Sequence, residues 1–379
     1  MRNKINTYFF KEFISLFTLI LMSLGAIVWI VQSVNYLDFV TEDGHSFGVY
    51  FTYSLLNIPK IISKLIPFVF MISLLSTIIQ FEKNNELLIL WTSGLNKINL
   101  VNFIIKCSIL ISLLQLLLAS TINPSALYLG RSILKSSDIG LFPSLLKEKK
   151  FNDTVEKLTV FIEEKKNNGE MSNILLRDDT SRVEKSRTIV AKTGIIKKEN
   201  EKNILILFEG TIHSEKTNGK INFLDFDRTE INLSSFTTKT TTFPKFQERS
   251  TFALLNCFTI FNDKLPVQEK NIIEKFRCNN KVEITSELNR RIGMPFYIPL
   301  ISIIICYILS TRRESKNFYY QKWVVLAVGF SILTFAEIMV RYSGKSNLYT
   351  SVYYVFPPLI LFLNYLNLIR IFKFENLVR

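Results

Sequence analysis

The sequence has little of the chemistry that most enzymes use. Its 379 residues include two histidines, His45 and His213, and four cysteines. Neither set shows the short spacings at which protein ligands surround a metal ion. Redox and metal catalysis therefore have no support, and we predict no catalytic residue, no metal and no cofactor.

A nucleotide-binding loop and a cleavable signal peptide are also missing. Gly344, Lys345 and Ser346 imitate the end of a phosphate-binding loop, but the glycine required five residues before Gly344 is replaced by Met339. The apolar stretch that follows Lys11 is too long for a signal peptide, and no A-x-A site closes it. We therefore expect no ATP binding by this chain and an uncleaved first anchor.

Apolar surface, in contrast, is abundant: 48% of the residues are hydrophobic and 32 are phenylalanine. A helix of ~20 apolar residues spans the ~30 Å hydrocarbon core of a membrane. Six runs reach that length, and they predict an α-helical membrane protein with six transmembrane helices. The runs are Phe13 to Val34, Leu55 to Gln80, Ile98 to Ile122, Ile292 to Leu309, Val324 to Val340 and Tyr349 to Ile371.

Lysine and arginine in the short connections predict the orientation, because such residues collect on the cytoplasmic side. Basic residues occur in the N-terminal segment, the second connection, the fifth connection and the C-terminal segment, whereas the first connection has none. Both termini are therefore expected in the cytoplasm. Arg290 and Arg291 run against this rule, but a long domain precedes them, and long domains cross membranes largely regardless of charge.

That long domain changes the periodicity from helical to alternating. Stretches such as KLTVFIEEK and NILILFEGTIH are rich in β-branched and aromatic residues and are separated by Gly, Asn and charge. They predict an all-β domain, either a sandwich or an open barrel. The run from Ile204 to Phe208 is apolar on both faces, so we expect an open trough or strand edge, with inward positions such as Ile206.

These patterns divide the chain into four parts. Residues 1–134 hold transmembrane helices 1–3, with a short cytoplasmic helix at about 84–95. Residues 135–266 form the β-domain, 267–291 a helical linker, and 292–379 transmembrane helices 4–6. Cys257 and Cys278 lie in the outer part, where an oxidising compartment would allow a disulfide, but the pattern leaves their pairing open.

The short helix lies in KNNELLILWTSGLNK, residues 83–97. Glu86 leads its first turn, where a negative charge is favourable, and Gly94 is a natural C-terminal stop. Leu87, Leu90 and Trp91 share one face. Two interpretations stay open: a helix that docks into a partner's groove, or an ordinary interfacial loop helix.

This segment resembles that of the LptF/LptG (YjgP/YjgQ) lipopolysaccharide export permeases, in which a Glu is followed eight residues later by a Gly. Four further motifs, in the same order, strengthen the resemblance, and it covers the whole chain. They are NIPKIISKLIP in the second helix, TINPSALYLGR at the end of the third, ELNRRIGMPF before the fourth and VFPPLILFL in the last.

The resemblance implies the membrane half of an ABC exporter in the bacterial inner membrane. Expected partners are a paralogous LptG-like permease, a cytoplasmic LptB-like ATPase, a periplasmic LptC/LptA-like bridge and lipopolysaccharide itself. The stretch WIVQSVNYLDF favours LptF over LptG. The β-domain is expected to be a periplasmic jellyroll, and Glu86, Leu87, Leu90, Trp91 and Gly94 would form the helix that couples to the ATPase.

Charges near the outer ends of the helices supply the candidate substrate contacts. Lys60 and Lys64 project from one face of the second helix, because they are four residues apart. With Arg131 and Arg341 they would form a cationic rim for the phosphates of lipid A. The alternative is ordinary snorkelling of lysines near helix ends, with Arg341 paired to Glu337 one turn earlier.

Two other classes of function remain as alternatives. A stand-alone secondary transporter would need broken helices and inverted repeats, and only Pro59 and Pro67 suit it. A membrane-anchored enzyme of envelope synthesis would need clustered acids, and only Asp38, Glu42 and Asp43 are candidates. Co-purification with a soluble ATPase would distinguish the exporter from both.

Overall fold

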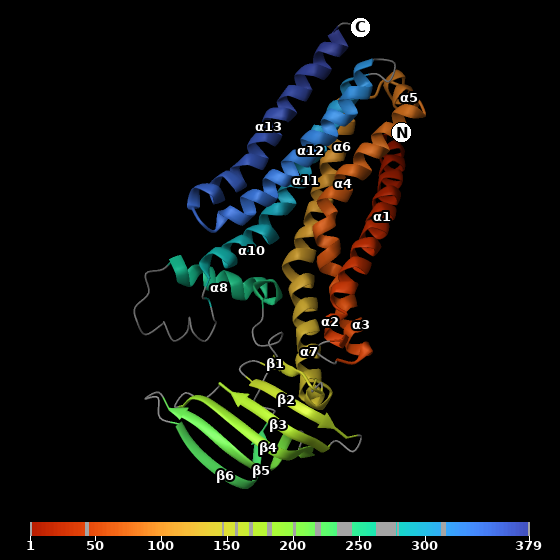
Figure 1. Cartoon of the computed structure of the whole chain (residues 1–379). Helices are drawn as coiled ribbons and strands as arrows, with labels where there is room; N and C mark the ends of the chain where they lie inside the picture. Colours follow the sequence, from red (N-terminus) through yellow and green to blue (C-terminus); the bar gives the residue numbers. More distant parts are fainter. Residues whose placement is uncertain are drawn as a thin grey trace. The chain divides into compact units, whose positions relative to one another are not determined.

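The computed structural model describes residues 2–41, 45–145, 148–155, 158–166, 170–179, 184–199, 202–216, 221–232, 245–262, 278, 280–311 and 316–377. They belong to two compact units (Figure 1). Unit 1 comprises Met1–Ile30, Asn57–Leu127 and Lys245–Arg379, and unit 2 comprises Val31–Leu56 and Tyr128–Pro244. Unit 1 is helical, and unit 2 contains the sheet. Glu42 and Asp43 fall outside the described residues.

Within the described residues, six helical segments are long and apolar enough to cross a membrane, which confirms the predicted class and number. The second segment joins two helices, the third contains a π-helical turn, and the fourth is interrupted by a 3-10 turn. The helices are α1 (Arg2–Asn35), α2 (Asp38–Thr41), α3 (Phe47–Leu56), α4 (Ile58–Lys83), α5 (Glu86–Thr92), α6 (Lys97–Leu117), η1 (Leu118–Ile122), α7 (Asn123–Leu145), η3 (Phe246–Glu248), α8 (Thr251–Asn262), α10 (Lys281–Gly293), η5 (Met294–Phe296), α11 (Tyr297–Cys306), η6 (Tyr307–Ser310), α12 (Lys316–Ser343) and α13 (Asn347–Leu377).

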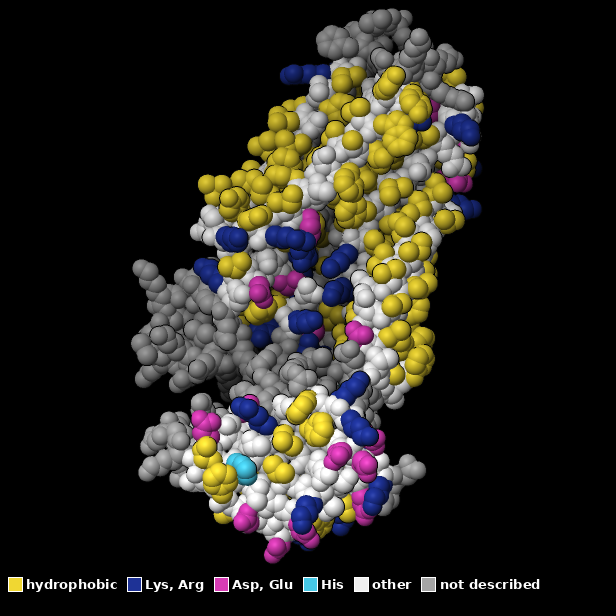
Figure 2. Space-filling model, viewed as in Figure 1, with side chains coloured by type: hydrophobic (Ala, Val, Ile, Leu, Met, Phe, Trp, Pro, Cys, Tyr) yellow, Lys and Arg dark blue, Asp and Glu magenta, His cyan; other side chains and the backbone are white. Residues whose placement is uncertain are grey.

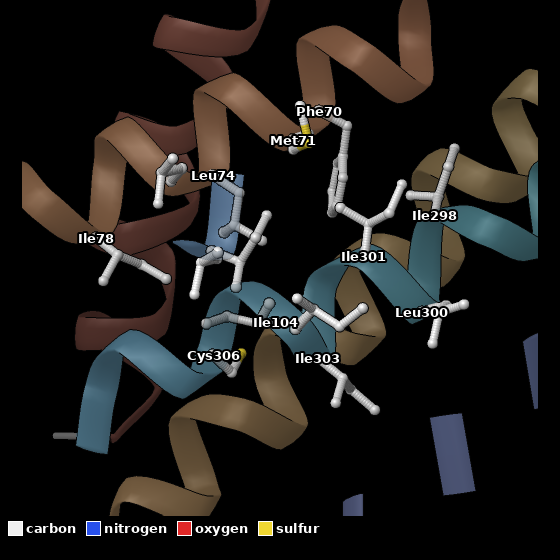
Figure 3. Packing of buried hydrophobic residues seen from close by; sticks show 14 of the residues in the cluster. Phe70, Met71, Leu74, Ile78, Ile104, Ile298, Leu300, Ile301, Ile303 and Cys306 are labelled. Carbon is white, nitrogen blue, oxygen red and sulfur yellow. The ribbon is translucent and has the colours of Figure 1, made fainter. Parts of the chain in front are cut away.

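The core of unit 1 lies between α11 and its neighbours. All ten residues of α11 are buried, as expected for a helix that is apolar on every side. Phe70, Leu74 and Ile78 of α4 pack against this helix, and Ile104 of α6 lies beside it (Figure 3). The fourth membrane segment is therefore the central one, and close packing between helices stabilises it, because lipid chains give no hydrophobic drive for helices to associate.

Polar side chains follow the contact between α6 and the fourth segment. Ser302 donates to Ser108 Oγ at 3.3 Å, and Ser112 donates to the carbonyl of Pro295 at 2.8 Å. One turn further along α6, Gln115 Nε2 donates to the carbonyl of Ser63 at 3.1 Å. Each bond satisfies a polar group that would be costly in hydrocarbon, and together they fix the register of α4, α6 and α11.

The strands of unit 2 form one antiparallel sheet in sequence order, so each strand pairs with the next. This confirms the predicted all-β part of the fold. The strands are β1 (Phe151–Val155), β2 (Leu158–Lys165), β3 (Glu170–Asp178), β4 (Glu184–Glu199), β5 (Lys202–Lys216) and β6 (Ile221–Asn232). Among the described strands, β1 and β6 are the two edges.

One row of residues crosses the sheet and changes its pleat. Asn173 and Glu209 on this row have left-handed φ angles of 48° and 46°. Buried residues within a strand are normally two apart, but Met171 and Ile174, on either side of the row, are three apart. In a regular strand, residues three apart lie on opposite faces. The irregular row absorbs one residue, so the apolar side chains on both sides of it lie on the same face along the whole strand.

That buried face carries the sheet's hydrophobic core, which is made of Leu158, Val160, Ile162, Met171, Ile174, Leu176, Ile189, Ala191, Leu205, Leu207 and Ile212. Leu205 and Leu207 are 1% and 0% exposed, whereas Ile206 between them is partly exposed. The choice of Ile206 as an inward position is therefore wrong, because strand alternation turns its two neighbours toward the core instead.

The boundaries of the β-domain differ from those expected. Helix α7 continues to Leu145, and Thr251–Asn262, inside the range assigned to the β-domain, form α8 of unit 1. Cys257 of α8 and Cys278 form a disulfide with 5.7 Å between their Cα atoms, which settles the pairing left open. Most of the linker expected at 267–291 lies outside the described residues, and its last part is α10.

Candidate functional site

A cavity of about 230 Å³ lies within unit 1. Its wall comes from the first half of α4, the end of α6, η1, the start of α7, η3, the end of α10, η5 and the middle of α12. Figure 2 shows that Lys, Arg, Asp and Glu side chains gather at one end of the broad hydrophobic surface of the helices. The residues lining the cavity are Lys60, Ser63, Lys64, Pro67, Phe68, Gln115, Ala119, Asn123, Leu127, Gln247, Glu287, Arg290, Arg291, Met294, Leu333 and Glu337.

Lys60 and Lys64 supply two cations from one face of α4. Both line the cavity, as the four-residue spacing predicts. Among the residues that the structure describes, neither lysine makes a hydrogen bond or an ion pair, although acidic groups such as Glu287 lie close enough to act on both electrostatically. Their ammonium groups are therefore available to an anion.

Arg290 adds a third cation from α10. Its Nη2 donates to Glu337 Oε1 of α12 at 2.7 Å, and its Nη1 lies 4.0 Å from Glu287 Oε2. Four basic and two acidic residues line the cavity, so its wall carries a net positive charge. A low-dielectric wall strengthens this charge for any anion that enters.

Arg291 has a different role, although it follows Arg290 directly. Its side chain is 3% exposed. Its Nε donates to Glu287 Oε1 at 3.0 Å, and its Nη groups donate to the carbonyls of Phe246, Gln247 and Arg249. Arg291 therefore fixes the segment before α8 against α10, and this contact holds Gln247 in the cavity wall.

The residue before these arginines fixes the other side of α10. Asn289 Nδ2 donates to Ser343 Oγ of α12 at 2.9 Å, and its Oδ1 accepts from the hydroxyl of Tyr354 in α13 at 3.1 Å. Successive residues of a helix point in directions about 100° apart. The sequence Asn-Arg-Arg thus contacts three different neighbours. Both arginines line the cavity, but the bonds of Arg291 go to Glu287 and to carbonyls of the segment before α8.

The rest of the wall is mostly apolar. Pro67 and Phe68 of α4, Leu333 of α12 and Met294 of η5 give it an oily surface beside the cations. Gln115 Oε1 and Asn123 Oδ1 are buried there without a hydrogen-bond partner among the described residues, so the wall also offers amide groups. An anionic head group joined to hydrocarbon chains suits this combination better than a small polar solute does.

The structure brings together only part of the predicted cationic rim. Lys60 and Lys64 line the cavity, whereas Arg341 is 73% exposed, does not line it, and lies 3.9 Å from Glu337. Arg131 belongs to unit 2. The sequence did not suggest Arg290 as a ligand contact, because it was considered only as an exception to the positive-inside rule. The available signal was its position in a polar Asn-Arg-Arg run near the end of a helix.

The short helix α5 forms between residues with left-handed backbone, Asn85 with φ 60° and Gly94 with φ 86°. Asn84 Nδ2 donates to Glu86 Oε1 at 3.1 Å. Figure 1 shows α5 at the end of unit 1 where the N-terminus of α1 and the C-terminus of α13 also lie.

The predicted apolar face of α5 packs inward. Leu87 is 2% exposed, and Leu90 and Trp91 pack against the core of unit 1. Leu88 and Ile89 are 52% and 63% exposed. Leu88 and Ile89 are therefore the most exposed apolar side chains of α5, and the sequence does not reveal this, since a short helix of mostly apolar residues has no obvious outer face.

Comparisons with known proteins match most of the chain. The family model described as lipopolysaccharide export system permease LptF/LptG matches residues 7–371. An uncharacterized protein of Rickettsia prowazekii (strain Madrid E), RP871, is 26% identical over 330 residues, which cover 86% of this chain and 86% of that protein. The cavity, α5 and the sheet all lie within the matched residues.

Proposed function

Since the chain belongs to the LptF/LptG family of lipopolysaccharide export permeases, we propose that it is the permease subunit of an ABC exporter. The exporter would extract lipopolysaccharide from the inner membrane and pass it to a periplasmic bridge that leads to the outer membrane. The family is one of transporters and not of enzymes.

The cavity is the observation that carries this proposal. Lipid A joins phosphate groups to several acyl chains, and the cavity wall joins Lys60, Lys64 and Arg290 to an apolar surface. Charge-assisted bonds from lysine and arginine to phosphate are among the strongest that side chains make. Because these cations lie between membrane helices, a lipid would reach them from the bilayer without crossing water.

The partner ATPase would bind at α5. Glu86 begins this helix, and the exposed pair Leu88 and Ile89 offers an apolar contact beside that carboxylate. Helices laid into grooves use such a pattern. ATP hydrolysis would thus occur in a separate LptB-like subunit, and α5 would transmit its closure to α4 and α6, which flank it.

The sheet of unit 2 would join the periplasmic bridge. Strand β6 is an edge among the described strands and exposes Ile221, Phe223 and Leu224. An open edge with apolar side chains accepts a strand from another chain. An LptC/LptA-like partner would extend the sheet there, and a paralogous LptG-like permease would complete the transmembrane assembly.

The orientation follows from the same assignments. Both termini and α5 would face the cytoplasm, and unit 2 would face the periplasm, in agreement with the lysine and arginine distribution. The stretch WIVQSVNYLDF, from Trp29 to Phe39, supports an LptF-like rather than an LptG-like subunit.

Purification from the native membrane tests the proposal directly. A tagged chain should bring down a soluble ATPase and a second permease, identified by mass spectrometry. The purified assembly in proteoliposomes should release lipopolysaccharide when ATP is added and not when a non-hydrolysable analogue replaces it. A chain that purifies alone and moves a solute along an ion gradient would contradict the proposal.

A further inference from the structure

Glu337, one of the two acids in the cavity wall, needs an explanation, because a site for phosphates gains nothing from a carboxylate. Glu337 lies between two arginines. Its Oε1 is 2.7 Å from Nη2 of Arg290, inside the cavity wall, and 3.9 Å from Nε of Arg341, one helical turn later. Arg290 is 27% exposed and Arg341 is 73% exposed.

We propose that Glu337 is a carboxylate switch that makes the cavity select ligands with two separate phosphates. In this structure Glu337 holds Arg290. When a second phosphate arrives, Glu337 turns to Arg341 and Arg290 binds the phosphate. This inference rests on the proposed function, since it takes a phosphorylated lipid as the ligand.

The exchange is favourable because the incoming group is the stronger partner. A phosphate monoester carries about −1.5 to −2 charges at neutral pH and accepts two parallel bonds from a guanidinium, whereas a carboxylate carries one charge. Glu337 also keeps a cation after it moves, since Arg341 is placed at the i,i+4 distance. Neither charge is left unpaired at the membrane edge.

The other charges of the site do not replace this exchange. Glu287 also approaches Arg290, at 4.0 Å, but its Oε1 accepts from the buried Arg291, which holds it in place. Lys64 lies within electrostatic range of Glu337, but it lines the cavity and is itself a ligand contact. Arg341 is the cation near Glu337 that the cavity does not use.

The selectivity follows from the difference between the two sides of the cavity. Lys60 and Lys64 need no exchange, so a lipid with a single phosphate binds to them and leaves the Arg290 to Glu337 pair intact. A lipid with two phosphates also takes Arg290 and draws Glu337 away. Removing the carboxylate should therefore improve binding of the second lipid and barely affect the first.

A competing role for Arg341, direct contact with the ligand, predicts a different pattern of mutant effects. In the switch, Arg341 acts only through Glu337, so its loss matters only while Glu337 is present. In direct contact, its loss weakens binding whether or not Glu337 is there. A double-mutant cycle separates the two.

The experiment uses the full-length chain with its co-purifying subunits in nanodiscs. Hexaacylated lipid A with two phosphates and its monophosphoryl form are the probes, and affinity is measured for wild type, E337Q, R341Q and the double variant. We expect E337Q to bind the bisphosphorylated lipid at least about threefold more tightly, with little change for the monophosphoryl lipid. R341Q should weaken bisphosphorylated lipid at least about threefold in wild type and not in E337Q.

The outcomes separate the two proposals. If wild type binds the lipids and R341Q weakens binding equally with and without E337Q, the switch is overturned and the lipid cavity stands. Equal gains from E337Q for both lipids overturn it as well. Failure of wild type to bind either lipid overturns the cavity's proposed function and the switch together. Because glutamine preserves the shape of Glu337 and the side chain of Arg341 is 73% exposed, thermal denaturation midpoints should stay close to wild type, and they are measured to verify this.

Discussion

Thr251 Oγ1 joins Arg291 to the third membrane segment: it accepts from Nη1 of Arg291 at 3.0 Å and donates to the carbonyl of Ser120 at 2.5 Å. Ser120 lies in the π-helical turn η1, and the residue four positions later, Pro124, has no N–H to donate to its carbonyl. The hydroxyl of Thr251 thus supplies a donor to this carbonyl and connects α10, the start of α8 and η1 around the cavity wall.

Arg291 is therefore expected to be a structural residue. Arg291→Met would leave several buried carbonyls and the Glu287 carboxylate without their donor, and breaking such a buried pair costs about 3–5 kcal/mol. We expect a clearly lower midpoint of thermal denaturation in detergent, measured by size-exclusion chromatography of heated samples.

Arg290→Met is the matched control. This side chain is partly exposed and faces the cavity, so its loss should lower the affinity for phosphorylated lipid more than it lowers the denaturation midpoint. Equal destabilisation by the two variants would show that our separation of the neighbouring arginines into binding and structural roles is mistaken.

The Cys257–Cys278 disulfide makes a prediction about the compartment. Disulfides persist in oxidising environments such as the bacterial periplasm. In intact cells the two thiols should resist alkylation until a reductant is added, whereas a cysteine introduced at Ser93, beside α5, should stay reduced. Free thiols at both native positions in untreated cells would contradict the outward orientation of α8.

Much of the membrane architecture could be predicted, because lipid imposes a length of about 20 apolar residues on each helix. The strands could be recognised for a similar reason, since alternation survives in Leu158, Val160 and Ile162. The pleat shift at Asn173 and Glu209 could not, because no single strand reveals that its neighbours share the irregularity.

The candidate site was predictable only in part. Lys60 and Lys64 follow from spacing on one helix. Arg290 and Glu337 come from helices far apart in the sequence, and their 2.7 Å contact depends on the packing of α10 against α12. The buried face of α5 could not be told from its exposed face in the sequence, because both sides are apolar and only the packing against the core distinguishes Leu87 from Leu88.

The two sides of α5 should respond differently to substitution. Ile89→Asp places a charge on a face that is exposed in this chain, so it should leave insertion and stability unchanged while reducing co-purification of the ATPase. Leu87→Ala removes a buried side chain and should lower stability by about 2–5 kcal/mol. Loss of stability from Ile89→Asp, with the ATPase retained, would refute this assignment.

Glu86→Ala tests the carboxylate on the same helix. The chain should still insert and fold, but ATP-driven release of lipopolysaccharide from proteoliposomes should fall, because the proposed electrostatic contact with the ATPase is lost. An unchanged release rate would remove Glu86 from the coupling role and leave the apolar pair to carry it.

The final prediction concerns the route of the lipid along the sheet. Leu224 and Phe223 are consecutive on β6 and similarly exposed, at 61% and 67%. Leu224 pairs with the buried Ile212 and so lies on the face of the hydrophobic core, whereas Phe223 pairs with His213 on the opposite face. That opposite face has a hollow of about 780 Å³ whose lining mixes apolar side chains with the charged Lys192, Glu209 and Asp225, whereas the other face carries the sheet's hydrophobic core, so acyl chains should prefer the core face.

A photoreactive amino acid at Leu224 should therefore form adducts with lipopolysaccharide during active export, and the same group at Phe223 should form few. The adducts should require ATP, and Leu207, buried on the same face, should give them if the core opens to admit the chains. Adducts to protein alone from Leu224 and Leu207, or equal lipid adducts from Phe223, would limit the sheet to docking a partner through its edge.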